Sequence, residues 1–100
     1  NLIELFCADN FLTDLDVSQN PSLEILDCSE NNLNVLNVSS NTMLRELNCS
    51  NNNLLELDIS NANLLEDLKC DSNDLNNKPD IYLNSDPPPN KTCMQIELYL

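Results

Sequence analysis

The sequence predicts one mainly β domain, built as a solenoid of stacked coils. Cys7, Cys28, Cys49 and Cys70 follow one another at intervals of 21 residues, and apolar residues recur at the same offsets in every interval. A fixed period of this length is typical of coils that bury their apolar residues against the neighbouring coils. The pattern defines coils over residues 2–22, 23–43 and 44–64, followed by an irregular coil over 65–85.

Each coil divides into two halves. The first half reads LxxLxC, as in LEILDC, and the alternation of apolar and polar residues predicts a short strand with Leu and Cys pointing inward. Equivalent strands should pair in parallel along the solenoid. The second half reads LxxLDV or a close variant. We expect extended or turn segments there and few or no helices, because each half is too short for a helical apolar face.

Six columns of apolar residues are expected to face the interior. They are Leu2/Leu23/Leu44/Leu65, Leu5/Leu26/Leu47/Leu68, the four cysteines, Leu12/Leu33/Leu54/Leu75, Leu15/Leu36/Leu57 and Val17/Val38/Ile59.

Asparagine forms two further columns, which we interpret as structural. They are Asn10/Asn31/Asn52/Asn73 after the first half and Asn20/Asn41 after the second. An inward amide can satisfy loop backbone groups that have lost contact with water. Asparagine also tolerates a left-handed backbone, so we expect these columns to make the turns in a chain without glycine.

The two ends of the chain depart from the repeat. The fourth coil has Lys78 and Asp80 where apolar residues are expected, and an insertion ends in Pro87–Pro89. Residues 90–100 should then form a terminal strand, with Cys93, Ile96 and Leu98 in core positions. The chain opens directly on a repeat, although a solenoid end normally carries a cap. We therefore expect 1–100 to be one domain of a longer protein, or its front edge to be covered by a partner.

The pattern LxxLxCxxNxLxxLDVSxN, present over residues 2–75, resembles the 21-residue leucine-rich repeats of bacterial surface proteins, including the internalin with a cysteine ladder. The ending NKTCMQIEL is similar to the terminal repeat of secreted leucine-rich proteins of the Bacteroidetes group. The resemblance implies a right-handed curved solenoid with its parallel sheet on the concave face, export to the cell surface or secretion, and a role in recognition or adhesion. It brings no catalytic residues.

The charge of −13 argues against nucleic acid and anionic lipid, since both require a basic face. No apolar stretch is long enough for a membrane span, so direct membrane insertion is not expected.

The chain lacks histidine, the usual base for a nucleophile, and glycine, which a phosphate loop needs. We therefore expect the chain to have no enzymatic activity and to bind no cofactor or resident metal. Carbohydrate hydrolysis by Asp16 and Asp58 is the hypothesis that we rank last. Calcium binding at Glu66, Asp67, Asp71 and Asp74 is a further hypothesis that the sequence leaves open.

The cysteine column is interpreted as a structural ladder of free, buried thiols. Disulfides between stacked neighbours and a zinc site remain alternatives. Parallel side chains hold their Cβ atoms too far apart for a bridge, and a straight column cannot surround a zinc ion.

The outward side chains of the first-half strands form what we call the concave face, and they are the candidate binding residues. Unlike Ser18, Ser39 and Ser60 in the second half, they change chemistry from coil to coil, as expected of positions free to contact a ligand. Phe6 and Ile25 are apolar residues directed at water. The set comprises Phe6, Ile25, Asp27, Glu46, Asn48, Asp67 and Lys69, with Glu4 in the same row.

The sequence therefore predicts a non-enzymatic recognition or adhesion module that binds a protein, or a glycan, on its concave face. The alternative is a structural spacer or self-association module that forms a homodimer through an uncapped N-terminal edge at Leu2 and Leu12.

Overall fold

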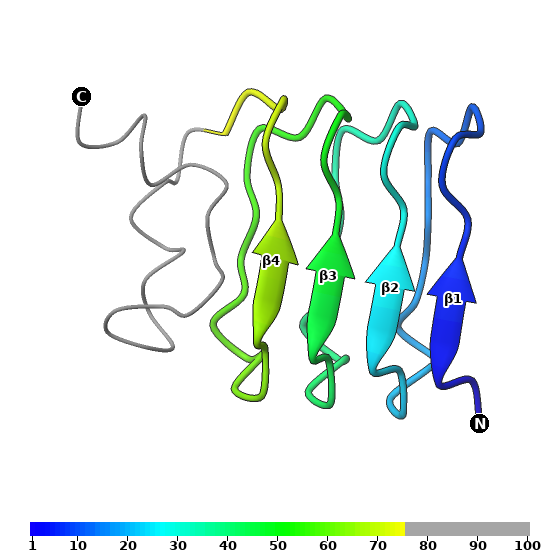
Figure 1. The fold of residues 1–100 in the computed structure, drawn as a ribbon, viewed down its shortest axis with the longest axis vertical. Helices are drawn as coiled ribbons and strands as arrows, with labels where there is room; N and C mark the ends of the chain where they lie inside the picture. The colour runs from blue at the N-terminus through cyan, green and yellow to red at the C-terminus, as the bar shows by residue number, and fades with distance from the viewer. Residues whose placement is uncertain (76–100) are drawn as a thin grey trace.

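The computed structural model describes residues 1–75. Its strands are β1 (Glu4–Phe6), β2 (Ile25–Asp27), β3 (Glu46–Asn48) and β4 (Asp67–Lys69). They form one parallel sheet in chain order, with one strand contributed by each coil (Figure 1). The expectations for the rest of the coil over 65–85, for the insertion and for the terminal strand over 90–100 lie outside the described residues.

The register of the sheet matches the repeat. Leu5, Leu26, Leu47 and Leu68 are successive Cα partners across the four strands. Backbone pairing continues past the strand ends, because the N–H of Cys28 donates to the carbonyl of Asn48 at 2.9 Å. Equivalent chain segments therefore lie side by side along the solenoid, and the predicted mainly β coil stack is confirmed.

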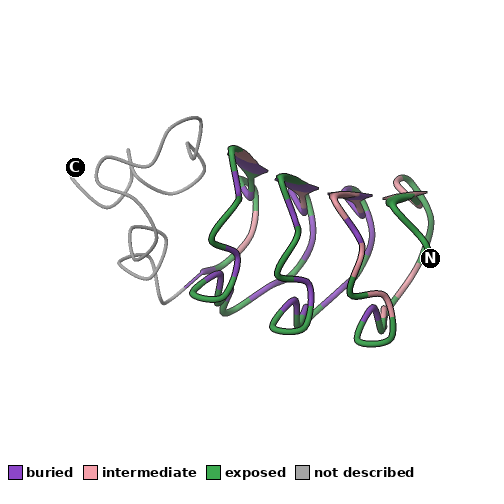
Figure 2. Cartoon of the chain, turned by 90° about the horizontal axis from the view of Figure 1, so that it is seen from below, coloured by how far each residue is buried: buried purple, intermediate pink, exposed green. Residues whose placement is uncertain are grey.

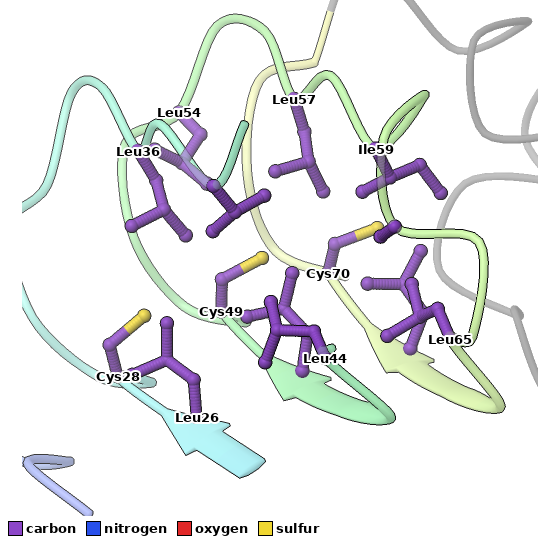
Figure 3. Packing of buried hydrophobic residues seen from close by; sticks show 14 of the residues in the cluster. Leu26, Cys28, Leu36, Leu44, Cys49, Leu54, Leu57, Ile59, Leu65 and Cys70 are labelled. Carbon is purple, nitrogen blue, oxygen red and sulfur yellow. The ribbon is translucent and has the colours of Figure 1, made fainter. Parts of the chain in front are cut away.

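The core is one continuous cluster of leucine, cysteine, valine and isoleucine side chains, with Ala62, between the two halves of the coils (Figure 3). Figure 2 shows where the buried residues lie along the chain. Every column member of the coils over 23–43 and 44–64 is buried, and so are Leu65, Leu68, Cys70 and Leu75. In the first coil Val17 is buried, Leu5, Cys7, Leu12 and Leu15 are partly buried, and Leu2 is 40% exposed. The first coil packs on a neighbour on one side only, which explains the difference.

The asparagine column after each strand joins neighbouring coils by hydrogen bonds. The Nδ2 of Asn52 donates to the carbonyls of Cys28, one coil back, and of Cys49, in its own coil, both at 3.1 Å. Its Oδ1 accepts from the N–H of Leu33 at 3.0 Å. Asn31 and Asn73 repeat this arrangement. The structural interpretation of this column follows from these bonds.

The prediction that these asparagines make the left-handed turns is wrong. The positive φ angles belong to the residue before each of them: Asp9, Glu30, Asn51 and Ser72, with φ between 54° and 60°. The asparagine that follows must direct its amide into the coil. The left-handed residue points outward and is exposed in every coil, so side-chain type is less restricted there.

The second half of each coil is extended and contains no strand or helix within residues 1–75. It ends in two consecutive turns: Asn41 N–H donates to the carbonyl of Val38, and Leu44 N–H donates to that of Asn41. Because residues 1–75 contain no helix, that part of the chain offers none long and apolar enough to cross a membrane.

Asn41 itself is fully buried, and its Nδ2 donates to the carbonyls of Val17 and Asn20 at 2.9 Å. This second column ends at the next coil, where Ala62 takes the position of Asn41.

Candidate binding surface

The side chains of β1–β4 line a shallow hollow of about 150 Å³ on the concave face. It contains all seven candidate binding residues, together with the inward-facing Leu26 and Leu47 as its floor. The register of the sheet brings these residues together, because residues 21 apart in sequence become direct neighbours. The grouping expected from the repeat is therefore present, and its use in binding remains a prediction.

One end of the hollow is apolar. Phe6 is 65% exposed, a large fraction for an aromatic side chain. Ile25 lies diagonally from it on β2 and is partly buried. An apolar pair directed at solvent on a sheet surface provides the kind of anchor position that protein interfaces use.

The other end of the hollow is charged. Glu46 and Asp67 are register partners on β3 and β4, so two like charges stand on adjacent strands. Lys69 lies on the neighbouring row of β4, opposite Asn48. Beside the strands, Arg45 Nη2 forms a salt bridge with Glu66 Oε2 at 2.8 Å, with both side chains more than half exposed. At such exposure the pair contributes at most about 1 kcal/mol to stability.

Two of the candidate residues also have a role within the coil. Asp27 Oδ1 accepts hydrogen bonds from the N–H and hydroxyl of Ser29, at 3.1 and 2.7 Å, and Asn48 Oδ1 does the same with Ser50. Sequence reasoning missed this function. The signal was an Asp or Asn two residues before a serine, which also occurs at Asp16–Ser18, where Asp16 Oδ1 accepts from the serine N–H.

A comparison with solved structures identifies a relative of known architecture. Residues covering 74% of this chain align with 16% of a chain described as the functional domain of InlJ from Listeria monocytogenes, which includes a cysteine ladder. The two are 43% identical over the aligned part, with a TM-score of 0.73. The chain thus spans a small part of that protein's length. No protein-family model and no curated protein matches the sequence.

The chain has an internalin-like leucine-rich-repeat fold with a cysteine ladder. The resemblance seen in the repeat motif is thereby confirmed in three dimensions.

The first three cysteines of the ladder are free thiols. Cys7 is partly buried, whereas Cys28 and Cys49 are fully buried, and all three are free. Loss of water contact raises the pKa of Cys28 to about 12 and raises that of Cys49 well above its usual value. These thiols therefore stay protonated at neutral pH and act as small apolar side chains.

The expectation of a free thiol is wrong for Cys70, which is disulfide-bonded. Cys7, Cys28 and Cys49 are free, so no bridge joins two of the four cysteines of the ladder. The distance between parallel side chains disfavours a bridge along the column, but it sets no limit on a bridge that leaves the column.

Asp16 and Asp58 do not have the properties of a hydrolytic pair. Hydrogen bonds from Ser18 and Ser60 lower the pKa of both carboxyls. An inverting glycosidase requires one of its two carboxyls to have a raised pKa and act as the acid. Within residues 1–75, no group of three or more acidic or cysteine side chains is arranged to hold a metal ion, and this includes the acidic residues around β4.

A larger hollow of about 520 Å³ lies on the opposite side of the coils, which we call the convex face. Its exposed apolar residues are Val35 and Leu55, at 72% and 53%, and the buried Leu36 also lines it together with Glu56 and Asp58. We assign it no ligand, but its exposed residues provide matched controls for the concave face.

Proposed function

We propose that this domain is a non-enzymatic recognition module of a secreted or surface protein, and that it binds a protein partner through the concave face. The supporting observation is the contrast between the asparagine positions that join the coils and the outward positions of the concave face. The asparagine bonds that hold coils together recur without change, while the concave-face chemistry differs from strand to strand. The internalin-like fold supports the same role.

A preformed sheet suits this function. Within residues 1–75, β2 and β3 are held on both sides by backbone pairing, β1 and β4 pair on one side, and side-chain amides fix the turns after the strands. Little conformational entropy is then lost when the side chains of the concave face meet a ligand. The residues that line the hollow come from all four strands, which favours an elongated protein segment, and a glycan is the alternative ligand.

The test uses substitutions that other coils already carry or closely match. Phe6→Asn introduces the residue of the third coil at this position, and Ile25→Gln is the uncharged counterpart of Glu4 and Glu46. The convex control combines Val35→Gln with Leu55→Asn, which replace exposed apolar residues by the same two polar residues. Thermal unfolding of both double variants first checks that the coils are intact.

The wild-type chain and both double variants are then applied to arrays of purified extracellular proteins and of glycans. We expect signals on protein spots that fall at least tenfold for the concave variant and persist for the convex control. Signals confined to glycans would replace the protein partner by a carbohydrate. Binding that survives the concave substitutions would reject the concave face as the site.

The second candidate, self-association through the N-terminal edge, has its own supporting observation. Leu2 and Ile3 are 40% and 41% exposed. Leu12 is only partly buried, whereas its counterparts in the later coils are buried. Light scattering over a hundredfold concentration range would show a dimer that is lost in Leu12→Gln. A monomer at every concentration would exclude this candidate.

A further inference from the structure

The charge arrangement of the concave face contains a feature that costs stability. Glu46 and Asp67 are direct register partners on adjacent parallel strands, which lie about 4.8 Å apart. Like charges placed opposite one another on a sheet are destabilising. In the part of the chain that the structure describes, the salt bridge that forms is Arg45–Glu66, which leaves this acidic pair without an ionic partner.

The pair is also part of a broader imbalance. Glu4 and Asp27 flank the apolar pair at the other end of the hollow, so four carboxylates share this face with one ammonium group, that of Lys69. The whole chain carries a charge of −13. A second copy of this chain is therefore a poor occupant, and a cationic segment is complementary.

We propose that the concave hollow binds a basic segment of a partner protein, with one apolar side chain seated against Phe6 and Ile25 and a lysine or arginine between Glu46 and Asp67. The inference rests on the proposed function and specifies the chemistry of the partner. The apolar contact provides affinity at a desolvated point, while the acidic pair selects for charge and accelerates association.

The sheet also sets the spacing within that segment. The apolar pair lies over β1 and β2 and the acidic pair over β3 and β4, so the two subsites are about two strand spacings, or about 10 Å, apart. An extended chain covers this distance in about three residues. A helix covers it in about seven. The partner should therefore carry its apolar and basic residues at one of these two separations.

The first measurement uses no ligand. Glu46→Gln removes the repulsion while keeping the size of the side chain, so we expect the melting temperature to rise by about 2 °C. Glu56→Gln is the matched control, because Glu56 is an exposed glutamate on the convex face. It should leave the melting temperature unchanged. A Glu46→Gln protein that is no more stable than the control would contradict the strain on which the proposal is based.

The second measurement selects displayed random 12-residue peptides on the immobilised chain at low salt. We expect enriched peptides to be basic, with an apolar residue three or seven positions from a lysine or arginine. Their affinity should fall at least tenfold for Glu46→Gln combined with Asp67→Asn, and also at 0.5 M NaCl. The control is Asp14→Asn with Glu56→Gln, at two exposed positions on the convex face, where Asp14 and Val35 line a common hollow. It removes two charges there and should bind normally.

The outcomes separate the two proposals. Neutral or acidic peptides that lose affinity with Phe6→Asn and Ile25→Gln would overturn the basic partner and leave the concave site standing. Basic peptides that are equally weakened by the convex control would reveal general attraction to an acidic protein and overturn the inference. Peptides that bind every variant equally, or a selection without enrichment, would count against both proposals.

Discussion

At the scale of single residues, the turn after each strand depends on a side chain that tolerates a left-handed backbone. The chain has no glycine, and Asp9, Glu30, Asn51 and Ser72 take this role with φ between 54° and 60°. Asparagine, aspartate and glycine adopt this conformation most readily, and glutamate has no such preference. Glu30 is therefore a position of local backbone strain.

Glu30→Asn should relieve this strain and raise the free energy of unfolding by about 0.5–1 kcal/mol, since the third coil already has asparagine at the same place. Urea unfolding measures the change. Glu30→Gln is the matched control, because it removes the charge but keeps the backbone preference of glutamate. If both variants gain the same stability, the effect comes from charge and the strain argument fails.

At the scale of the coil, the asparagine column after each strand adds hydrogen bonds between successive coils to those that the short strands provide. Each strand has three residues, and the amide of Asn52 adds bonds to the backbone of two coils at once. Asn10 occupies the same place in the first coil, but its Nδ2 reaches only local carbonyls, those of Cys7 and Ala8. The same residue type therefore contributes differently in the two coils.

Asn52→Ala should destabilise the domain by about 3 kcal/mol, because it leaves the N–H of Leu33 and the carbonyls of Cys28 and Cys49 without these partners in a buried site. Asn10→Ala should cost about 1 kcal/mol or less, since its partners are exposed. Chemical unfolding of the two variants tests the difference. Equal losses would mean that the column acts within each turn and does not link the coils.

At the scale of the whole molecule, the repeat determines which structural features could be predicted from the sequence. The positions of Leu26, Cys28 and Val38 in the core follow from periodicity, because every coil meets the same packing requirement. The left-handed position and the role of Asp27 in fixing the turn through Ser29 were missed. Both depend on backbone geometry, and the residue type at these positions differs from coil to coil, so no repeated residue marks them. The disulfide at Cys70 was missed because it departs from the repeat.

The cysteine ladder predicts how the stability of the whole solenoid depends on pH. Burial raises the pKa of Cys28 from 9.0 to about 12 and raises that of Cys49 as well. The unfolded chain loses these protons above pH 9, whereas the folded chain keeps them. The stabilising contribution is therefore complete below about pH 9 and is lost as pH rises towards 12. Each thiol should remove about 1.4 kcal/mol of stability per pH unit in this window.

The measurement is the free energy of unfolding between pH 7 and 11, for the wild type and for Cys28→Ala combined with Cys49→Ala. The double variant should be less stable at pH 7, because each substitution opens a small cavity between coils. Its stability should nevertheless decline less steeply above pH 9, since both buried thiols are absent. The other groups that titrate in alkali are common to both proteins and cancel in the comparison. If the free energy of unfolding fell equally steeply with pH in both proteins, burial would not be what keeps these thiols protonated. Cys28 and Cys49 would then have to be accessible to water.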